Sequence, residues 1–560
     1  MSIKLVVSKA IETEQVHARS PRCYLKTTRH ENRQRNQMAI SLLDSLFAQF
    51  PQQWLLLLLL VILLPVISYL LLTRRSAEKG LKLPPGPPRL PVLGNLHQLG
   101  PLTHQSLSDL ARRHGPVMFL RLGMTTALAV SSAAAARDVM KAHDAHCCNR
   151  PELPGNKQLT YGFKTVAFSP YGDYWRSMRR LFATELLGAR RVRAAWATRQ
   201  EQVRKLMAAL GEAAARSAPV AMEERVYGVA DGIIGTMAFG SVYAAAEFAG
   251  RYERFQHVLN EAMDVSAGFA AEDFFPNAAG RLADRLTGVV ARRERVVRDL
   301  DAFFESVIEH RMDLGPEDDD DTGAGLVDAL VGLWKQGEQG FTKDNVKAIL
   351  LDSFLGGVET SSVTILWAMS ELVRKPQVMR KAQEEIRAAV AAVGGGSVQP
   401  DDLPKFRYLK MVVKETMRLH PPAPLLLPRE TAGNVQIGGY DVPAGTRVLV
   451  NVWAIGRDPV SWGEDAEEFV PERFEASEVD FRGAHFELLP FGAGRRMCPG
   501  IAMGSANVEF TLANMLYGFD WALPDGVEEV SMEEAGKLTI HPKTPLVLVP
   551  TVYRPARGQQ

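Results

Sequence analysis

The sequence predicts a mainly α-helical fold with small β-sheets, arranged as a single large domain preceded by one N-terminal transmembrane helix. Long amphipathic segments dominate the chain, whereas segments with β character are short. Hydrophobic residues make up 46% and charged residues 23% of the 560 residues, as is typical of a globular protein, so general disorder is excluded. No repeat of about 20–50 residues is present in the sequence, which excludes a solenoid.

The charge balance and the cysteine content exclude further classes of protein. Lys and Arg total 65 and Asp and Glu total 64, which gives a formal net charge of +1. A nucleic-acid-binding protein usually has a basic excess, so no nucleic-acid partner is expected. The four cysteines are too few for a disulfide scaffold, and they lack the CxxC spacing of a structural zinc site.

The first predicted element is the uncharged apolar run at residues 54–72, WLLLLLLVILLPVISYLLL. It exceeds the ~18 apolar residues that a membrane-spanning helix requires, which predicts a transmembrane anchor. A cleaved signal peptide is the alternative, but signal-peptide cores span only about 7–15 residues. Arg74, Arg75 and Lys79 follow the run, so the positive-inside rule places the rest of the chain in the cytosol.

The segment before the anchor carries a charge that conflicts with this orientation. Residues 1–37 contain eight Lys or Arg and three Glu, whereas residues 38–53 contain no Lys or Arg. We therefore expect translation to start at Met38 and residues 1–37 to be a non-native leader, and a genuine transit or disordered leader is the alternative. After the anchor, residues 73–88 form a basic stop followed by a stiff, proline-rich hinge, PPGPP.

Beyond the hinge, hydrophobic periodicity predicts one large domain at residues 89–560. Three long segments have the apolar spacing of helices, at residues 191–215, 289–311 and 342–374. Long helices with few strands favour one α-dominated domain over several small domains. Short apolar runs predict strands at residues 117–122, 127–130, 435–437 and 447–452.

The segment 491–500, FGAGRRMCPG, indicates a metal-binding loop. Its glycines allow a tight turn and a close approach to a flat partner, and Arg496 can reach a carboxylate. Helical periodicity starts at residue 501, so Cys498 lies near a helix N-terminus, where partial positive charge lowers the pKa of a thiol. We interpret the segment as a loop that presents a thiolate ligand, and a thiolate on haem iron favours O–O cleavage.

This segment resembles the haem-binding signature of the cytochrome P-450 monooxygenases, and the chain from residue 84 onward is most similar to plant microsomal A-type members. The resemblance implies haem b (iron protoporphyrin IX) with Cys498 as the axial thiolate ligand, and Phe491, Gly494 and Arg496 as further cofactor-binding residues. It also implies that molecular oxygen is a co-substrate and that electrons come from NADPH through a separate cytochrome reductase. The expected location is the endoplasmic reticulum membrane, crossed once, with the catalytic domain in the cytosol.

A second segment, WRSMR at residues 175–179, resembles the WxxxR helix of the same family. The resemblance implies that Trp175 and Arg179 bind a haem propionate. Arg429 occupies the position at which a second propionate-binding arginine is expected.

A third match involves ETMR at residues 415–418 and PERF at residues 471–474. Glu415 and Arg418 are three residues apart and share a helix face, which on its own is typical of a surface ion pair. The resemblance implies instead that both join Arg473 in a buried network with a structural role.

The fourth match is GGVETS at residues 356–361, inside a long apolar helix. Its two glycines weaken the helix, and an acid beside a hydroxyl is suited to proton transfer. A loosely packed helix with a surface pair is the alternative on the residues alone. The resemblance implies that Thr360 and Glu359 are catalytic, with Thr360 steadying dioxygen and Glu359 controlling proton delivery.

The family's substrate-contact segments correspond to residues 161–168, 352–356, 423–427 and 537–540. These segments are mostly apolar, which predicts a small hydrophobic or aromatic substrate, although each side chain could equally belong to the core. The predicted substrate-pocket residues are Phe163, Val166, Phe354, Gly356, Leu425, Leu426 and Leu538.

Three further stretches, at residues 271–277, 362–377 and 485–500, resemble 4-hydroxyphenylacetaldehyde oxime monooxygenases of cyanogenic glucoside formation. This similarity implies dehydration of an aldoxime to a nitrile and hydroxylation of the nitrile to a cyanohydrin. A hydroxylase of another plant specialised metabolite, such as a terpenoid or an alkaloid, is the main alternative. A non-catalytic haem sensor and a membrane-tethered scaffold are more remote alternatives.

Overall fold

The computed structural model describes residues 80–244, 249–314, 325–337 and 340–554. The predicted leader at residues 1–37 and the predicted anchor at residues 54–72 lie outside the described residues, as do residues 73–79 of the segment 73–88. Contacts group the chain from Gly80 to its end into one unit.

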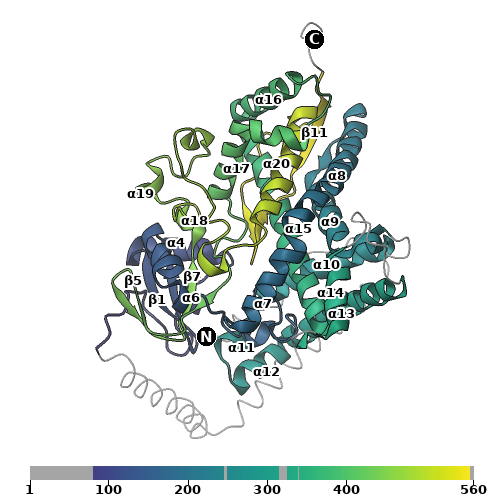
Figure 1. Cartoon of the computed structure of the whole chain (residues 1–560). Coiled ribbons are helices and arrows are strands. Elements are labelled where there is room, and N and C mark those ends of the chain that lie inside the picture. The colour runs from purple at the N-terminus through teal and green to yellow at the C-terminus, as the bar shows by residue number, and fades with distance from the viewer. Residues whose placement is uncertain (1–79, 245–248, 315–324, 338–339, 555–560) are drawn as a thin grey trace, which may run out of the picture. The chain divides into compact units, whose positions relative to one another are not determined.

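Helices make up most of this unit (Figure 1). They are α4 (Thr103–His114), α5 (Ala133–Arg137), α6 (Asp144–Cys147), α7 (Asp173–Leu181), α8 (Ala189–Ala215), α9 (Met222–Phe239), α10 (Ala249–Ala267), α11 (Ala271–Phe274), α12 (Ala278–Leu286), α13 (Val289–Asp313), α14 (Leu326–Gln336), α15 (Lys343–Arg374), α16 (Pro376–Ala391), α17 (Arg407–Leu419), α18 (Val452–Ile455), α19 (Pro459–Trp462) and α20 (Ile501–Gly518). The helices predicted at residues 191–215, 289–311 and 342–374 correspond to α8, α13 and α15.

The strands form small sheets, as the sequence predicts. They are β1 (Val117–Leu122), β2 (Thr125–Val130), β3 (Val220–Ala221), β4 (Arg429–Glu430), β5 (Val435–Ile437), β6 (Tyr440–Val442), β7 (Arg447–Val450), β8 (Phe519–Ala522), β9 (Glu534–Gly536), β10 (Ile540–Pro542) and β11 (Val547–Val552). The described sheets have the orders β1-β2-β7-β4, β3-β11-β8, β5-β6 and β9-β10.

The largest sheet contains an antiparallel hairpin and one parallel pairing. β1 and β2 pair in antiparallel register from Val117 opposite Val130, and β2 pairs in parallel with β7. The strand predicted at residues 447–452 ends at Val450, and the next residue, Asn451, is the N-cap of helix α18. Its side chain accepts a hydrogen bond from the Ala454 N–H and thereby caps α18.

Helix α15 contacts α9 and α20 in the middle of the helical part of this unit (Figure 1). Most of its side chains are buried, and the indole N–H of Trp367 donates to the Ile540 carbonyl at 2.9 Å. Among the described residues it is the one helix long and apolar enough to cross a membrane, and its burial identifies it as a core helix. It continues as a helix through Gly356 and Gly357.

Candidate active site

A cavity of about 320 Å³ lies between α7, α15, the start of α20 and the loops at residues 422–427 and 490–500. Its walls are mainly apolar, and Cys498 and Phe491 are among the residues that line it. Cys498 is surrounded by protein yet keeps accessible surface, because it opens on this cavity. Cys498 is therefore placed to reach a group bound inside the protein.

The backbone explains why the Cys498 loop is rich in glycine. Gly492 and Gly494 have φ angles of 67° and 70°, in the left-handed region that favours glycine. A Cβ atom at Gly494 would also collide with a neighbouring backbone carbonyl oxygen. The Cys498 N–H donates to the Phe491 carbonyl at 2.9 Å, which closes the loop just before α20 begins.

The surroundings of the Cys498 thiol have opposing electrostatic effects. Burial raises its pKa, whereas the N–H of Gly500 and the positive charge of Arg179 lower it. The N-terminus of α20 adds partial positive charge at the same place. A bound metal ion deprotonates a coordinating thiol outright, so a metal in this cavity would favour the thiolate.

Four arginines line the same cavity: Arg150, Arg179, Arg429 and Arg496. Within the part of the chain that the structure describes, the one acid paired with any of them is Asp144, 3.2 Å from Arg429. Burial lowers the pKa of Arg496 to about 10, and the charges of Arg429 and Arg179 lower it as well. The cluster therefore carries excess positive charge, which favours the binding of an anionic group.

Trp175 and Arg496 lie in contact, with the Arg496 guanidinium 4.3 Å from the centre of the Trp175 ring. The Trp175 indole N–H donates to the Val166 carbonyl at 3.1 Å. Arg496 donates to the carbonyls of Cys148 at 2.8 Å and Ser169 at 2.7 Å. These bonds hold both side chains at the edge of the cavity.

The residues around the cavity fit an iron porphyrin. Cys498 supplies a thiolate, which suits haem iron. The arginine cluster supplies the positive charge that two propionates require, and the apolar walls suit the macrocycle. Gly492, Gly500 and Gly504 also line the cavity, so the backbone there can approach a flat ring closely.

Thr360 and Glu359 face different spaces, and their predicted catalytic roles stay predictions. Thr360 lines the Cys498 cavity, and its hydroxyl donates to the Gly356 carbonyl at 2.7 Å. Glu359 lines a neighbouring hollow of about 280 Å³, together with Asp231 and Tyr227. The reason is helical geometry, because adjacent residues project about 100° apart around a helix with 3.6 residues per turn.

Thr539 connects Glu359 to the Cys498 cavity. Its hydroxyl donates to the Glu359 carboxylate, and Thr539 itself lines the cavity. Burial raises the pKa of Glu359, although the hydrogen bond from Thr539 opposes this effect. Glu359 therefore holds a proton more readily than an exposed glutamate does.

Glu415, Arg418 and Arg473 meet in one buried network. Arg418 forms two hydrogen bonds with the Glu415 carboxylate, at 2.7 and 2.8 Å, and Arg473 donates to the same carboxylate at 2.9 Å. The N–H of Val470 donates to it as well, at 2.7 Å. The network joins α17 to the segment around PERF. None of its three side chains lines the Cys498 cavity.

The predicted substrate-pocket residues divide into two groups. The structure places Val166, Gly356, Leu426 and Leu538 in the cavity wall. The substrate-contact loops therefore converge on the space next to Cys498.

Phe163, Phe354 and Leu425 are not among the described residues that line this cavity, so their assignment to the substrate pocket stays a prediction that the cavity wall does not support. Phe354 lies two residues before Gly356, on another face of α15, and packs against Phe239 with ring centres 4.9 Å apart. Leu425 packs against the core beneath β1 and β2, and Phe163 is buried outside the cavity wall.

The structure also reveals two cavity residues that the sequence reasoning did not single out. Asp352 accepts hydrogen bonds from the backbone N–H groups of Val166 and Ala167, which fastens the 161–168 loop to α15. Burial raises the pKa of Asp352 to about 7. Arg150 donates to the Leu427 carbonyl at 2.7 Å. An acid inside the apolar run of α15 was the available signal for Asp352.

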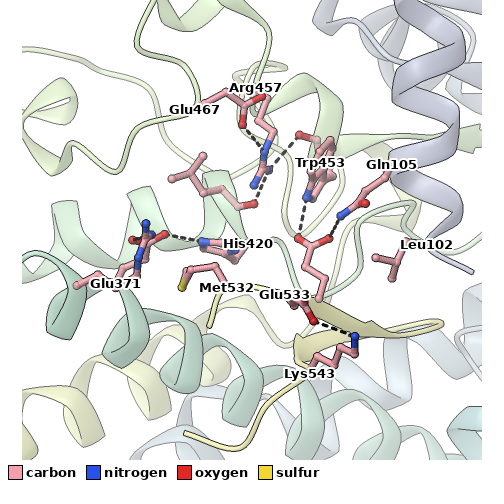
Figure 2. A pocket seen from close by; sticks show the side chains of 13 residues that line it. Leu102, Gln105, Glu371, His420, Trp453, Arg457, Glu467, Met532, Glu533 and Lys543 are labelled. Carbon is pink, nitrogen blue, oxygen red and sulfur yellow. Dashed lines mark hydrogen bonds and ion pairs between the residues drawn. The ribbon is translucent and has the colours of Figure 1, made fainter. Parts of the chain in front are cut away.

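A different, polar hollow of about 470 Å³ lies beside α17 and β9 (Figure 2). Its charged side chains pair with one another, as Figure 2 shows for Arg457 with Glu467 at 3.0 Å and His420 with Glu371 at 2.8 Å. It shares no lining residue with the Cys498 cavity. Because its charges are already satisfied internally, we do not assign the chemistry to this hollow.

A helical fold with small sheets, a buried cysteine before a helix N-terminus and an arginine cluster beside it together define the class of haem-thiolate proteins. The cytochrome P450 family model matches residues 84–549, and the chain belongs to this family. It is therefore a monooxygenase, an oxidoreductase that uses haem with a cysteine thiolate ligand, dioxygen and electrons delivered by a reductase.

Two plant relatives resemble the chain over nearly its whole length. A 4-hydroxyphenylacetaldehyde oxime monooxygenase of Sorghum bicolor is 58% identical, over 91% of this chain and 97% of the relative. A 2-methylbutanal oxime monooxygenase of Manihot esculenta is 46% identical, over 92% of this chain and 100% of the relative. The predicted plant family is therefore confirmed.

A solved zebra fish cytochrome P450 structure with progesterone matches the fold with a TM-score of 0.67 and 25% identity. The match covers 80% of this chain and 99% of that structure. It confirms the predicted cytochrome P450 fold of the domain.

Proposed function

We propose that the chain converts 4-hydroxyphenylacetaldehyde oxime to the corresponding cyanohydrin, a step of cyanogenic glucoside synthesis. The aldoxime first loses water to give a nitrile. The nitrile then gains one oxygen atom from O2, while two electrons from NADPH and two protons reduce the other oxygen atom to water. The 58% identity with the Sorghum bicolor relative carries this proposal, and the Manihot esculenta relative also acts on an oxime.

The chemistry of a haem-thiolate centre is the activation of dioxygen. We propose Cys498 as the ligand, and Trp175, Arg179, Arg429 and Arg496 as the residues that hold the propionates. Their positions around one cavity support these roles. The apolar wall that includes Val166, Leu426 and Leu538 would orient the aromatic ring of the substrate and exclude water.

Proton delivery is proposed to involve Thr360, Glu359 and Thr539. Thr360 faces the cavity from α15 and can hold a proton donor close to the substrate. Glu359 reaches the same cavity through the Thr539 hydroxyl rather than directly. The raised pKa of Glu359 suits a group that stores a proton and releases it on demand.

Attachment to the endoplasmic reticulum membrane is also proposed. The apolar run at residues 54–72 has the length of a single membrane-spanning helix, and the basic residues after it favour a cytosolic domain. The proline-rich segment would act as a stiff spacer between the anchor and the domain.

Microsomes containing this chain and a cytochrome reductase test the proposal. With NADPH, we expect 4-hydroxyphenylacetaldehyde oxime to yield the nitrile and then the cyanohydrin, measured by mass spectrometry against microsomes with Cys498→Ala. A panel with 2-methylbutanal oxime, an alkaloid and a terpenoid defines the substrate class. Oxidation of the terpenoid with both oximes untouched would contradict the oxime assignment.

A further inference from the structure

Arg199, on α8, is a buried cation that has no carboxylate partner among the described residues. Its side chain is 0% exposed. Its Nε donates to the Asn507 side-chain oxygen at 2.6 Å, one Nη contacts the Met503 sulfur, and the other lies 3.4 Å from the Val192 carbonyl. The guanidinium also lies 4.7 Å from the centre of the Trp196 ring.

These partners are all neutral, so the positive charge of Arg199 is not balanced locally. Within the described residues, no carboxylate lies within ion-pair distance of Arg199, whereas the buried Arg418 and Arg429 each have one. Burial lowers the pKa of Arg199 to about 10, but the group remains protonated at neutral pH. An unpaired buried charge lowers the stability of the folded protein, so we expect it to be retained for a bound anion or for a function.

The charge of Arg199 lies directly behind one wall of the Cys498 cavity. Met503 and Asn507, its two side-chain partners, both line that cavity from the first turns of α20. α20 begins just after Cys498 and packs against α8. Arg199 is thus separated from the cavity by a single layer of side chains, and α8 and α20 are in contact (Figure 1).

We propose that Arg199 is a positioning residue that raises the reduction potential of the haem by placing an uncompensated positive charge behind the thiolate. Adding one electron to the ferric centre increases the negative charge in the cavity, and a nearby buried cation favours that state. Arg199 acts through its field and through Met503 and Asn507, without touching the cavity itself. The proposal requires the haem that the family uses and is independent of the substrate.

The size of the effect follows from the packing. Helices in contact have axes about 8–10 Å apart. At a charge separation of about 8–10 Å, and with an effective dielectric constant of about 20, a unit charge changes an equilibrium roughly twentyfold. For transfer of one electron, a tenfold change corresponds to ~59 mV, so a twentyfold change corresponds to ~77 mV.

A redox titration of the haem-loaded protein with dithionite as the electron donor tests the proposal. We expect Arg199→Met to lower the reduction potential by the twentyfold equivalent, ~77 mV. Arg199→Lys, which keeps the charge, should restore most of the potential. Arg204→Met is the matched control, because Arg204 lies on the same helix but is exposed and paired with Glu201, and it should leave the potential unchanged.

A merely structural role predicts a different pattern. If Arg199 only joins α8 to α20, Arg199→Met will destabilise the protein but keep the wild-type potential in the fraction that retains haem, which would overturn the proposal. Should Arg199→Met fail to bind haem, Arg199→Gln replaces it, because its amide can still donate to Asn507. The same fall in potential is then expected, and an unchanged potential again overturns the proposal.

Discussion

Replacing Arg418 with methionine should destabilise the domain far more than replacing a surface arginine. Arg418 and Glu415 are both 0% exposed, and the guanidinium makes two hydrogen bonds to the carboxylate. It also donates to the backbone carbonyls of Gly456, Ala466 and Glu468. The side chain therefore joins α17 to the segment that precedes PERF.

The magnitude follows from what Arg418→Met leaves behind. Methionine fills a similar volume but donates no hydrogen bond, so the buried carbonyls of Gly456 and Ala466 and the partly buried carbonyl of Glu468 lose a partner. Glu415 keeps Arg473 and the Val470 N–H but loses its two shortest side-chain bonds to a cation. Removing one partner of a buried ion pair costs about 3–5 kcal/mol, and we expect a loss of unfolding free energy in that range.

Urea denaturation, followed by far-UV circular dichroism, measures this loss. Arg281→Met is the matched control, because Arg281 is exposed and pairs with Glu272 at 3.5 Å. Such a surface pair contributes at most about 1 kcal/mol. If Arg418→Met also costs less than about 1 kcal/mol, the buried network does not stabilise the domain more than a surface pair does.

Three further variants test other contacts. Thr539→Val should lower the yield of product per NADPH several-fold without loss of haem, because Glu359 loses its hydrogen-bonded link to the cavity. Thr539→Ser keeps the hydroxyl and should keep the wild-type yield. An unchanged yield in Thr539→Val would remove Thr539 from the proton-delivery route. Wild-type protein should lose unfolding free energy as pH rises from about 4 to about 7, because the folded protein holds the Asp352 proton that the unfolded chain has released. Asp352→Asn should abolish this loss, which urea midpoints at pH 5 and 8 measure. An equal change of midpoint between the two pH values in both proteins would argue against it. Arg429→Met should weaken haem retention at least several-fold, measured by transfer to apomyoglobin, and wild-type retention would refute its assignment.

Short local motifs were sufficient to predict which residues surround Cys498. The loop at residues 491–500 places Cys498, Arg496 and the start of α20 within a few residues of one another, so short-range sequence was enough to predict their arrangement. The long helix α15 and the pairing of β1 with β2 follow in the same way from local periodicity.

Contacts between distant segments could not be predicted in this way. Glu359 and Thr539 are 180 residues apart, and only the folded chain brings them together. The tie between Asp352 and the Val166 N–H also joins separate segments. Phe354 is a different case, because helical spacing alone already places it on another face of α15 from Gly356.

The spectrum of the reduced, carbon monoxide-bound protein tests most directly whether Cys498 binds the haem iron as a thiolate. Wild-type protein should give the red-shifted Soret band of a thiolate-ligated haem. Cys498→Ala should lose this band, whereas Cys148→Ala, which removes a buried cysteine beside the same arginines, should keep it. Retention of the red-shifted band in Cys498→Ala would contradict the assignment of Cys498 as the ligand.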